Sequence, residues 1–344
     1  MSKPLKVGLI DGDMVAFSHS AAEEYGKEED DISFTHIQMG MDAKLEYLKR
    51  RLNLDVMYVF ISGDDNFRFV INPDYKANRN GVWRPTNLNN AKAHLRTCWD
   101  AMSMRGLEAD DLIACFARYN YTVTTGKHNK IRTLSKPEKW PEGTQIYVCS
   151  LDKDLKQIPS INYSWETSTK GEKTETVKGF GEIRVIIKGA GKTPKKEVKG
   201  VGTKFFLWQL LTGDGTDGVI GCGIKVKKIY QSGKKAGQEY EKREGIGAME
   251  AFDILNDCTS YSQGLQRVIT QYKRVFGTSW EQALITSGRQ LYMVNTIIDS
   301  DKALMWHFNG LLKIYFDLGD QKLVRLIDGN WVDANIETEE LAAA

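Results

Sequence analysis

Three short apolar runs, each followed at once by acidic residues, constrain the fold of this chain more than any other feature. The runs span residues 5–10, 56–61 and 145–149, and helical patterns lie between them. Runs of this length that are rich in Val and Ile are typical of buried strands. Because strands that alternate with helices usually pair in parallel, we predict an α/β fold with a mostly parallel central sheet and flanking helices.

Acidic residues follow each of these runs and recur in two further clusters. One cluster opens the helical pattern of residues 109–117, and the other follows an apolar helical run at 205–211. Taken alone, an acidic first turn is explained by the helix dipole. However, the carboxyl ends of parallel strands share one edge of a sheet, so we expect these side chains to converge there. The candidates at the strand ends and the helix start are Asp11, Asp64, Glu108, Asp110, Asp111, Asp152 and Asp154.

Such a cluster would need counter-ions. Two bare carboxylates ~4 Å apart repel by roughly 1 kcal/mol in water and by about 4 kcal/mol at an effective dielectric near 20. Oxygen ligands without Cys or His select Mg²⁺ or Mn²⁺. This many carboxylates suits two ions, an arrangement that serves hydrolysis of phosphodiesters. The sequence therefore predicts a two-metal site, with Lys76 and Arg79 available to neutralise charge on the phosphate.

Basic and glycine-rich segments indicate a polyanionic substrate. Residues 72–84 interleave aromatic and basic groups, a composition that stacks on bases and contacts phosphates. Glycine pairs near helix starts expose backbone N–H groups to phosphates. Between the pairs lies a charged insertion, 225–244, which we expect to be mobile, and a basic stripe runs from Lys188 to Lys204. The candidate DNA-binding residues are Tyr75, Arg84, Gly221, Gly223, Gly245, Gly247, Lys225 and Lys227.

Composition excludes several other classes. The net charge is only +2, from 47 basic and 45 acidic residues, so the clusters reflect segregation rather than an overall charge. Five cysteines without a CxxC pair predict neither a zinc site nor a disulfide framework, and they favour a cytoplasmic location. No apolar run approaches the roughly 18–20 residues that span a membrane.

The ordered motifs LIDGD, SGDD, YKANR, LEADD, SLDKD and GDGTDG resemble the 5′-nuclease family, which includes flap endonucleases. The resemblance is greatest to the 5′→3′ exonuclease of short-tailed phages. It implies a PIN-like nuclease core over 1–204, with a helical gateway at about 72–104. It also implies a duplex-binding region of helix-hairpin-helix type over 205–280, and a C-terminal segment, 281–344, that packs on the core and ends in a frayed tail.

The resemblance assigns roles residue by residue. It places the seven acids named above at the metal site and adds Asp214 and Asp217 to them. It also places Lys76 and Arg79 on the scissile phosphate and Tyr75 on DNA. Asp13 and Asp65 have no counterpart in the family pattern. The hairpin, which binds K⁺ in relatives, is interrupted here by the insertion, and K⁺ at this motif is a further expectation.

The resemblance implies a 5′→3′ exonuclease that acts on duplex DNA, with RNA primers in RNA–DNA hybrids and 5′ flaps as further substrates. The process would be phage DNA replication or recombination, in the cytoplasm of the host, with no protein partner indicated. One alternative is a phosphatase of haloacid-dehalogenase type, because Asp11-Gly12-Asp13-Met14-Val15 fits its motif and would make Asp11 a nucleophile. The others are a non-catalytic DNA-junction binder and a PIN-type ribonuclease.

Overall fold

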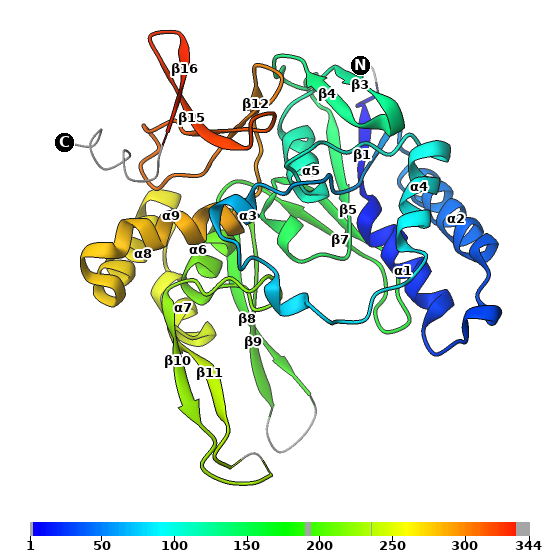
Figure 1. Cartoon of the computed structure of the whole chain (residues 1–344). Coiled ribbons are helices and arrows are strands. Elements are labelled where there is room, and N and C mark those ends of the chain that lie inside the picture. The colour runs from blue at the N-terminus through cyan, green and yellow to red at the C-terminus, as the bar shows by residue number, and fades with distance from the viewer. Residues whose placement is uncertain (1–2, 190–193, 235, 335–344) are drawn as a thin grey trace.

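The computed structural model describes residues 3–189, 194–234 and 236–334, and it is built around a five-stranded sheet (Figure 1). The strand order is β2-β1-β5-β6-β7, and the first four strands are parallel while β7 is antiparallel to β6. The predicted α/β class with a mainly parallel sheet is therefore confirmed. The strands are β1 (Lys6–Asp11), β2 (Val56–Phe60), β5 (Gln145–Cys149), β6 (Ser160–Ser164) and β7 (Lys173–Val177).

Helices cover both faces of this sheet. Successive residues of a strand point to opposite faces, so the strand residues pack alternately against the helices on the two sides. Ile10 packs with apolar residues of α1 (Gly12–Glu24), α2 (Phe34–Leu52) and α4 (Leu88–Cys98). Its neighbour Leu9 packs on the opposite face, where α5 (Ala109–Arg118) supplies Leu112 and Phe116. Because both faces of these strands are buried, their residues are apolar in succession rather than in alternation.

A second core lies among four helices further along the chain. Apolar residues of α6 (Gly202–Thr212), α7 (Ala248–Leu255), α8 (Tyr261–Phe276) and α9 (Trp280–Leu291) pack together. The Tyr272 hydroxyl on α8 donates to the carbonyl oxygen of Leu210 on α6 at 2.8 Å. This bond ties the segment that precedes the GDGTDG motif to the helical layer.

The chain continues from α9 into a five-stranded antiparallel sheet with the strands in sequence order. Phe316 and Ile297 of this sheet belong to the same apolar cluster as α5. No described helix is long and apolar enough to cross a membrane. The strands are β12 (Ile297–Ile298), β13 (Lys302–Leu304), β14 (Tyr315–Asp317), β15 (Lys322–Ile327) and β16 (Asn330–Asp333).

The remaining elements are short. The predicted gateway contains α4 and, before it, only the 3₁₀ turn η2 (Ala77–Arg79), so residues 80–87 are not helical. The other short elements are α3 (Arg68–Ile71), β3 (Val123–Thr125), β4 (Ile131–Leu134) and the 3₁₀ turns η1 (Glu29–Asp31), η3 (Lys127–Asn129), η4 (Asp154–Gln157) and η5 (Gly277–Ser279).

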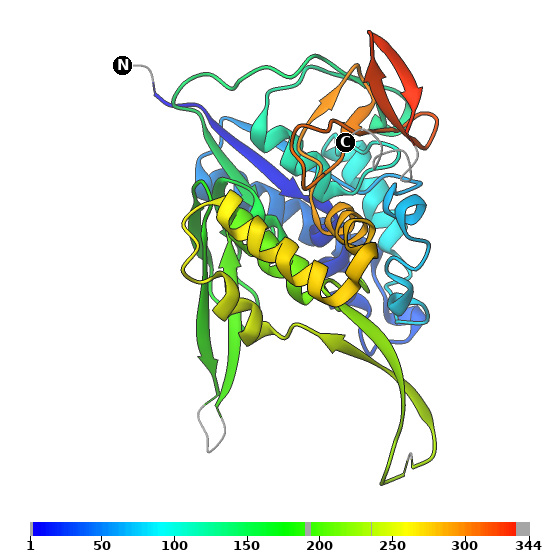
Figure 2. The same cartoon turned by 90° about the vertical axis from the view of Figure 1, so that its left-hand side faces the viewer.

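Two antiparallel β-ribbons extend from the body toward the same side of the molecule (Figures 1 and 2). One consists of β8 (Glu182–Lys188) and β9 (Lys195–Val201), and the other of β10 (Gly223–Ile229) and β11 (Glu239–Gly245). The second ribbon is the charged insertion, for which the sequence predicted no strands. Tyr230 and Tyr240 stack across it with ring centroids 4.2 Å apart, which stabilises the pairing.

The predicted basic stripe is interrupted at its C-terminal end. Lys204 is buried, and its ammonium group donates to the carbonyl oxygens of Asn256 at 2.8 Å and Cys258 at 2.9 Å. It therefore closes the end of α7 rather than facing solvent. Lys192 lies outside the described residues.

Candidate active site

The carboxyl ends of β1, β2 and β5 meet the start of α5 at one edge of the sheet, and a cleft of about 580 Å³ opens there. Carboxylates from four chain segments line the cleft, together with basic side chains from residues 68–92. The predicted convergence of acids at the strand ends is thus present for most of the set. The acids at the cleft are Asp11, Asp13, Glu108, Asp110, Asp152, Asp154, Asp214 and Asp217.

Asp11 is held firmly at the end of β1. One carboxylate oxygen accepts the Met14 N–H at 2.9 Å, which caps α1, and the other accepts the Ser150 hydroxyl at 2.6 Å. The side chain is almost fully buried. Burial raises the pKa of Asp11 to about 7, and repulsion from Asp13 and Asp152 adds to the shift, against the two hydrogen bonds.

Asp152 and Asp154 follow β5, where a tight turn holds both. The Asp154 N–H donates to an Asp152 carboxylate oxygen at 2.8 Å, and the Gln209 amide donates to Asp154 at 2.6 Å. Burial raises the pKa of Asp154 to about 7, with repulsion from Asp152 as the next cause. Burial likewise raises the pKa of Asp152.

Asp110 lies between these groups at the first turn of α5. Burial raises its pKa well above the ordinary value, and repulsion from Asp152, Asp11 and Glu108 acts in the same direction. Carboxylates crowded in this way repel one another, and nearby positive charge would relieve the repulsion. A divalent cation would supply it, which is the condition we expected of a metal site.

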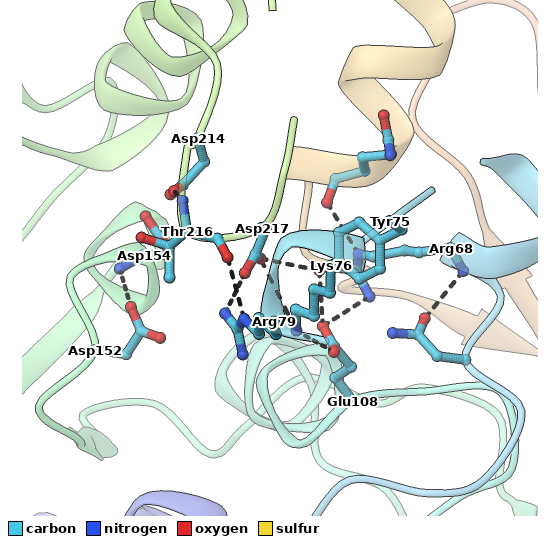
Figure 3. Close-up of polar contacts among 12 residues, drawn as sticks. Arg68, Tyr75, Lys76, Arg79, Glu108, Asp152, Asp154, Asp214, Thr216 and Asp217 are labelled. Atoms are coloured by element: carbon cyan, nitrogen blue, oxygen red, sulfur yellow. Dashed lines mark hydrogen bonds and ion pairs between the residues drawn. The ribbon is translucent and has the colours of Figure 1, made fainter. Parts of the chain in front are cut away.

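The other side of the cleft carries cations that hold its carboxylates in place (Figure 3). Arg79 pairs with Asp217, and Lys76 pairs with Glu108. The Tyr75 hydroxyl lies between the two acids, 3.0 Å from Asp217 and 3.2 Å from Glu108. The YKANR and GDGTDG motifs, about 140 residues apart in sequence, therefore form one side of the site.

Asp214 is held differently from Asp217. It accepts the Thr216 N–H at 2.7 Å, and its other oxygen contacts the Lys153 ammonium at 2.8 Å. Burial alone would raise the pKa of Asp214, but the hydrogen bond and charge of Lys153 lower it. Lys153 also lies 3.7 Å from Asp154, so this cation links the two motifs.

Asp111 does not face the cleft, contrary to the expectation that it is a metal ligand. It is fully buried, and both of its oxygens accept from the Arg68 guanidinium, at 2.7 and 2.8 Å. The same oxygens accept the N–H groups of Glu108 and Val294. Because these four donors occupy the carboxylate, its role in the structure is to anchor the start of α5.

Asp64 is also absent from the cleft. Its side chain is 70% exposed and pairs with Lys130 at 2.7 Å. The end of β2 instead presents Ser62, whose hydroxyl accepts the Ala109 N–H at 3.2 Å. One residue of backbone between Ser62 and Asp64 is enough to turn the carboxylate away from the strand-end edge.

Three residues that the sequence did not assign lie at the cleft. Asp13 accepts the Ser62 N–H at 3.1 Å and pairs with Lys92 of α4 at 2.8 Å. Arg68 is the third, and it lies 3.5 Å from a Glu108 oxygen. Asp13 lies two residues from Asp11, but in sequence it was indistinguishable from an Asp-Gly turn residue. Lys92 and Arg68 carry no local signal at all.

The predicted DNA-binding residues are divided among several places. Arg84 lines the cleft with Tyr75, whereas Lys225 and Lys227 lie on the β10–β11 ribbon. Gly223 and Gly245 pair at the base of this ribbon, and a Cβ on Gly245 would come within 2.5 Å of the Gly223 Cα. Close backbone approach therefore explains these two glycines.

The N–H groups around the glycine pairs are largely used within the chain. Those of Cys222, Gly223 and Ile246 donate to backbone carbonyl oxygens. Gly221 has φ +67°, a conformation that favours glycine, and Gly247 precedes the first residue of α7. These three N–H groups are therefore not available to bind phosphate, contrary to the expectation for the glycine pairs.

As the side chains stand, no group of three or more Asp, Glu, His or Cys in the described residues is arranged to hold a metal ion. Several of the carboxylates point toward cations of the chain itself. The donor set nevertheless fits a hard divalent cation, because it consists of buried oxygen ligands that also repel one another.

The raised pKa values predict a pH dependence of stability. Asp11 and Asp154 shift from 3.8 to about 7 on folding, so the folded state binds their protons more tightly than the unfolded state. Their favourable contribution is complete below the unfolded value and is lost as the pH rises to about 7. We expect the metal-free protein to lose on the order of a few kcal/mol through these groups between about pH 4 and about pH 8.

The measurement is the melting temperature in EDTA and in excess Mg²⁺ across this range. The stabilisation by Mg²⁺ should grow with pH, since deprotonated carboxylates bind the ion. His19, whose pKa is lowered by burial, affects both series equally and cancels in their difference. A Mg²⁺ effect that is constant with pH would contradict the prediction.

Comparison with known proteins finds no family model that matches the chain. Three similar solved structures come from bacteriophage T5, each with 14% sequence identity. A protein co-crystallised with metal ions covers 83% of this chain and 89% of its own, with a TM-score of 0.46. A mutant 5′-exonuclease covers 83% and 88%, with a TM-score of 0.44. A flap endonuclease in complex with DNA and metal ions covers 83% and 89%, with a TM-score of 0.47.

Two of these structures are described as a 5′-exonuclease and a flap endonuclease, the kinds of protein that the sequence motifs resemble, but their sequence identity to this chain is low. TM-scores below 0.5 are too low for the likeness to carry a conclusion about the activity of this chain. The chain is a mixed α/β protein with a carboxylate-lined cleft at the carboxyl edge of its parallel strands.

Proposed function

We propose that the chain is a metal-dependent 5′-nuclease that hydrolyses phosphodiester bonds from the 5′ ends of duplex DNA. The observation that carries this proposal is the union, in one cleft, of crowded carboxylates from β1, α5 and β5 with the cations Lys76 and Arg79. Acids alone would fit many metal sites, whereas acids facing a basic and aromatic wall fit a polyanionic substrate.

Asp11, Asp110, Asp152 and Asp154 are the residues that would hold Mg²⁺ or Mn²⁺, with Glu108, Asp214 and Asp217 as further ligands. Two such ions when bound would supply an activated water and a counter-charge for the leaving oxygen. Asp64 and Asp111 are left out of this set because neither lines the cleft. K⁺ at the interrupted hairpin remains a prediction.

Lys76 and Arg79 would bind the scissile phosphate. Both now neutralise carboxylates, and an incoming phosphate would compete for them with Glu108 and Asp217. Lys76 has a positive φ of 57°, and its N–H donates to the Asp217 carbonyl oxygen at 2.9 Å. This bond holds the backbone of Lys76 against the GDGTDG motif. Tyr75 is largely buried and supports both acids through its hydroxyl.

The geometry disfavours the phosphatase alternative. In that alternative Asp11 would be the nucleophile and the last acidic motif would follow a strand. The GDGTDG motif follows helix α6 rather than a strand. A junction-binding protein or a PIN-type ribonuclease is separated from a 5′-nuclease only by experiment.

The test uses a DNA duplex labelled at its 5′ or its 3′ end, incubated with Mg²⁺ or EDTA. We expect early release of 5′-labelled mono- or short oligonucleotides in Mg²⁺ only. Asp154→Ala should lower this rate at least about tenfold, since it removes a ligand and leaves the other carboxylates in place. Parallel reactions on an RNA–DNA hybrid and a 5′ flap define the substrate range.

Asp64→Asn provides the matched control, because it removes a carboxylate that follows a strand but lies outside the cleft. Its cleavage rate should stay within about threefold of the wild type, as is usual for an exposed site. Intact DNA under every metal condition would overturn the nuclease proposal. Phosphate release from a small ester, dependent on Asp11, would favour the phosphatase.

A further inference from the structure

A concentration of positive charge lies outside the cleft, on the β8–β9 ribbon, on and just before β7, and at Lys156 of η4. The proposed chemistry does not use it. We call it the basic surface. Its seven cations accompany only three acids, Glu175, Glu182 and Glu197. The local excess therefore exceeds the +2 of the whole chain. The cations are Lys156, Lys170, Lys173, Arg184, Lys188, Lys195 and Lys199.

Strand register places the ribbon cations on one face. Arg184 pairs with Lys199 in register, and Lys188 with Lys195, so all four side chains point to the same side. The opposite face carries Ile183 and Val198, which are buried against the helical layer. The basic face is therefore turned away from the core and open to solvent.

Glu175 of β7 joins the ribbon to the central sheet. It contacts Lys156 at 3.0 Å, Lys173 at 3.1 Å and Arg184 at 3.0 Å. One carboxylate cannot balance three cations. Burial lowers the pKa of Lys199, and repulsion from Lys188, Lys170 and Lys156 lowers it further against the attraction of Glu197. These cations repel one another, and a polyanion would relieve that repulsion.

The second ribbon is different, although the sequence had pointed to it. Lys225 lies 3.7 Å from Glu241, Lys227 lies 4.0 Å from Glu239, and Lys228 pairs with Glu244. Each of these three lysines thus has a carboxylate on the facing strand, although the two strands keep a net charge of +2 because they also hold Lys242 and Arg243. The three lysines would have to give up these partners to bind phosphate, whereas Lys195 and Lys199 are exposed without such cross-strand pairs in the described ion pairs.

The basic surface begins next to the cleft. The 3₁₀ turn η4 carries Asp154, which lines the cleft, and two residues later Lys156, which contacts Glu175 on the other side. From there the ribbon extends away from the body (Figure 2). A strand of seven residues spans roughly 20 Å at about 3.3 Å per residue. This length matches roughly six base pairs at 3.4 Å each.

We propose that the basic surface binds the phosphate backbone of duplex DNA that flanks the cleavage point, and that β8–β9 rather than β10–β11 is the ribbon that does so. The identity of the polyanion rests on the proposed function. The contacts would be to phosphates and would carry no sequence preference. Binding would then be strongly dependent on salt, because each neutralised phosphate releases counter-ions.

The test is fluorescence anisotropy of a labelled 20-base-pair duplex in EDTA, where no cleavage occurs. The variant Lys188→Gln/Lys195→Gln/Lys199→Gln should bind roughly 10- to 100-fold more weakly near 0.1 M salt, with the slope of log K against log [salt] shallower by about 2 to 3. The matched control, Lys225→Gln/Lys227→Gln, should bind within about twofold of the wild type. Melting temperatures establish that each variant is folded.

Equal affinity and slope for the triple variant and the wild type would overturn the proposal, as would a larger loss in the control. Absence of duplex binding by the wild type would overturn it as well. Lys195→Gln/Lys199→Gln, which keeps the Lys188–Glu197 pair, gives the same test if the triple variant fails to fold. Failure of the nuclease proposal would be distinguishable. If the wild type binds the duplex but does not cleave it in Mg²⁺, the nuclease proposal fails while the proposal for the basic surface stands.

Discussion

Replacing Asp110 with asparagine is expected to abolish metal-dependent cleavage and at the same time to raise the stability of the metal-free protein. The charge of Asp110 is opposed by its surroundings, through burial and then through Asp152, Asp11 and Glu108. Asparagine keeps the shape and removes the charge. We expect cleavage to fall by about 10²- to 10³-fold or more, the scale of losing one group that stabilises charge in a transition state.

The two readouts together distinguish loss of a ligand from general damage. The melting temperature in EDTA at about pH 8 should rise, because repulsion among the remaining carboxylates is weaker. The additional stabilisation by Mg²⁺ should shrink, because a ligand is gone. A variant that is less stable than the wild type in EDTA, or one that cleaves at the wild-type rate, would contradict this account.

Replacing Arg68 with methionine is expected to have the largest effect on stability. Arg68 is 3% exposed, and its guanidinium group donates to both oxygens of Asp111 and to the carbonyl oxygens of Gln290 at 3.0 Å and Tyr292 at 3.1 Å. Methionine fills much of the volume but leaves Asp111 as a buried, uncompensated charge. Removing one member of a buried ion pair costs about 3–5 kcal/mol.

Urea unfolding of Arg68→Met, Asp111→Leu and the double variant measures the cost and its origin. The double variant should recover a substantial part of the stability, since no isolated charge then remains. Cleavage should fall in all three, because the pair orients Glu108: Asp111 accepts the Glu108 N–H at 3.1 Å. A cost below about 1 kcal/mol for Arg68→Met would show that the pair is not structurally important.

The central strands were predictable because their signals are local. Residues 6–11, 56–60 and 145–149 form β1, β2 and β5, close to the apolar runs, and α5 begins where the acidic turn indicated. A buried strand must be apolar along its whole length, and a helix start favours acids, whatever surrounds them. The convergence of Asp11, Asp152 and Asp154 follows from parallel pairing alone.

The errors have a common physical cause. Asp64 and Asp111 belong to acidic motifs, yet one turns to Lys130 in solvent and the other to Arg68 in the core. Which way a side chain points near a turn depends on the backbone path and on partners that lie far away in sequence. The β10–β11 ribbon was missed because its strands carry charge on both faces and lack the apolar alternation of a half-buried strand.

By itself, the sequence determined the fold class, the strands and helix that carry the acids, and the conjunction of carboxylates with a basic aromatic segment. These depend on residue type and spacing along the chain. The tertiary structure alone decided which carboxylates share the cleft and that Arg68 and Asp111 anchor the start of α5. It also decided that Lys225, Lys227 and Lys228 on β10–β11 pair with acids, whereas Lys195 and Lys199 on β8–β9 have no partner among the described ion pairs. Those properties depend on the distances between charges, which only the folded arrangement sets.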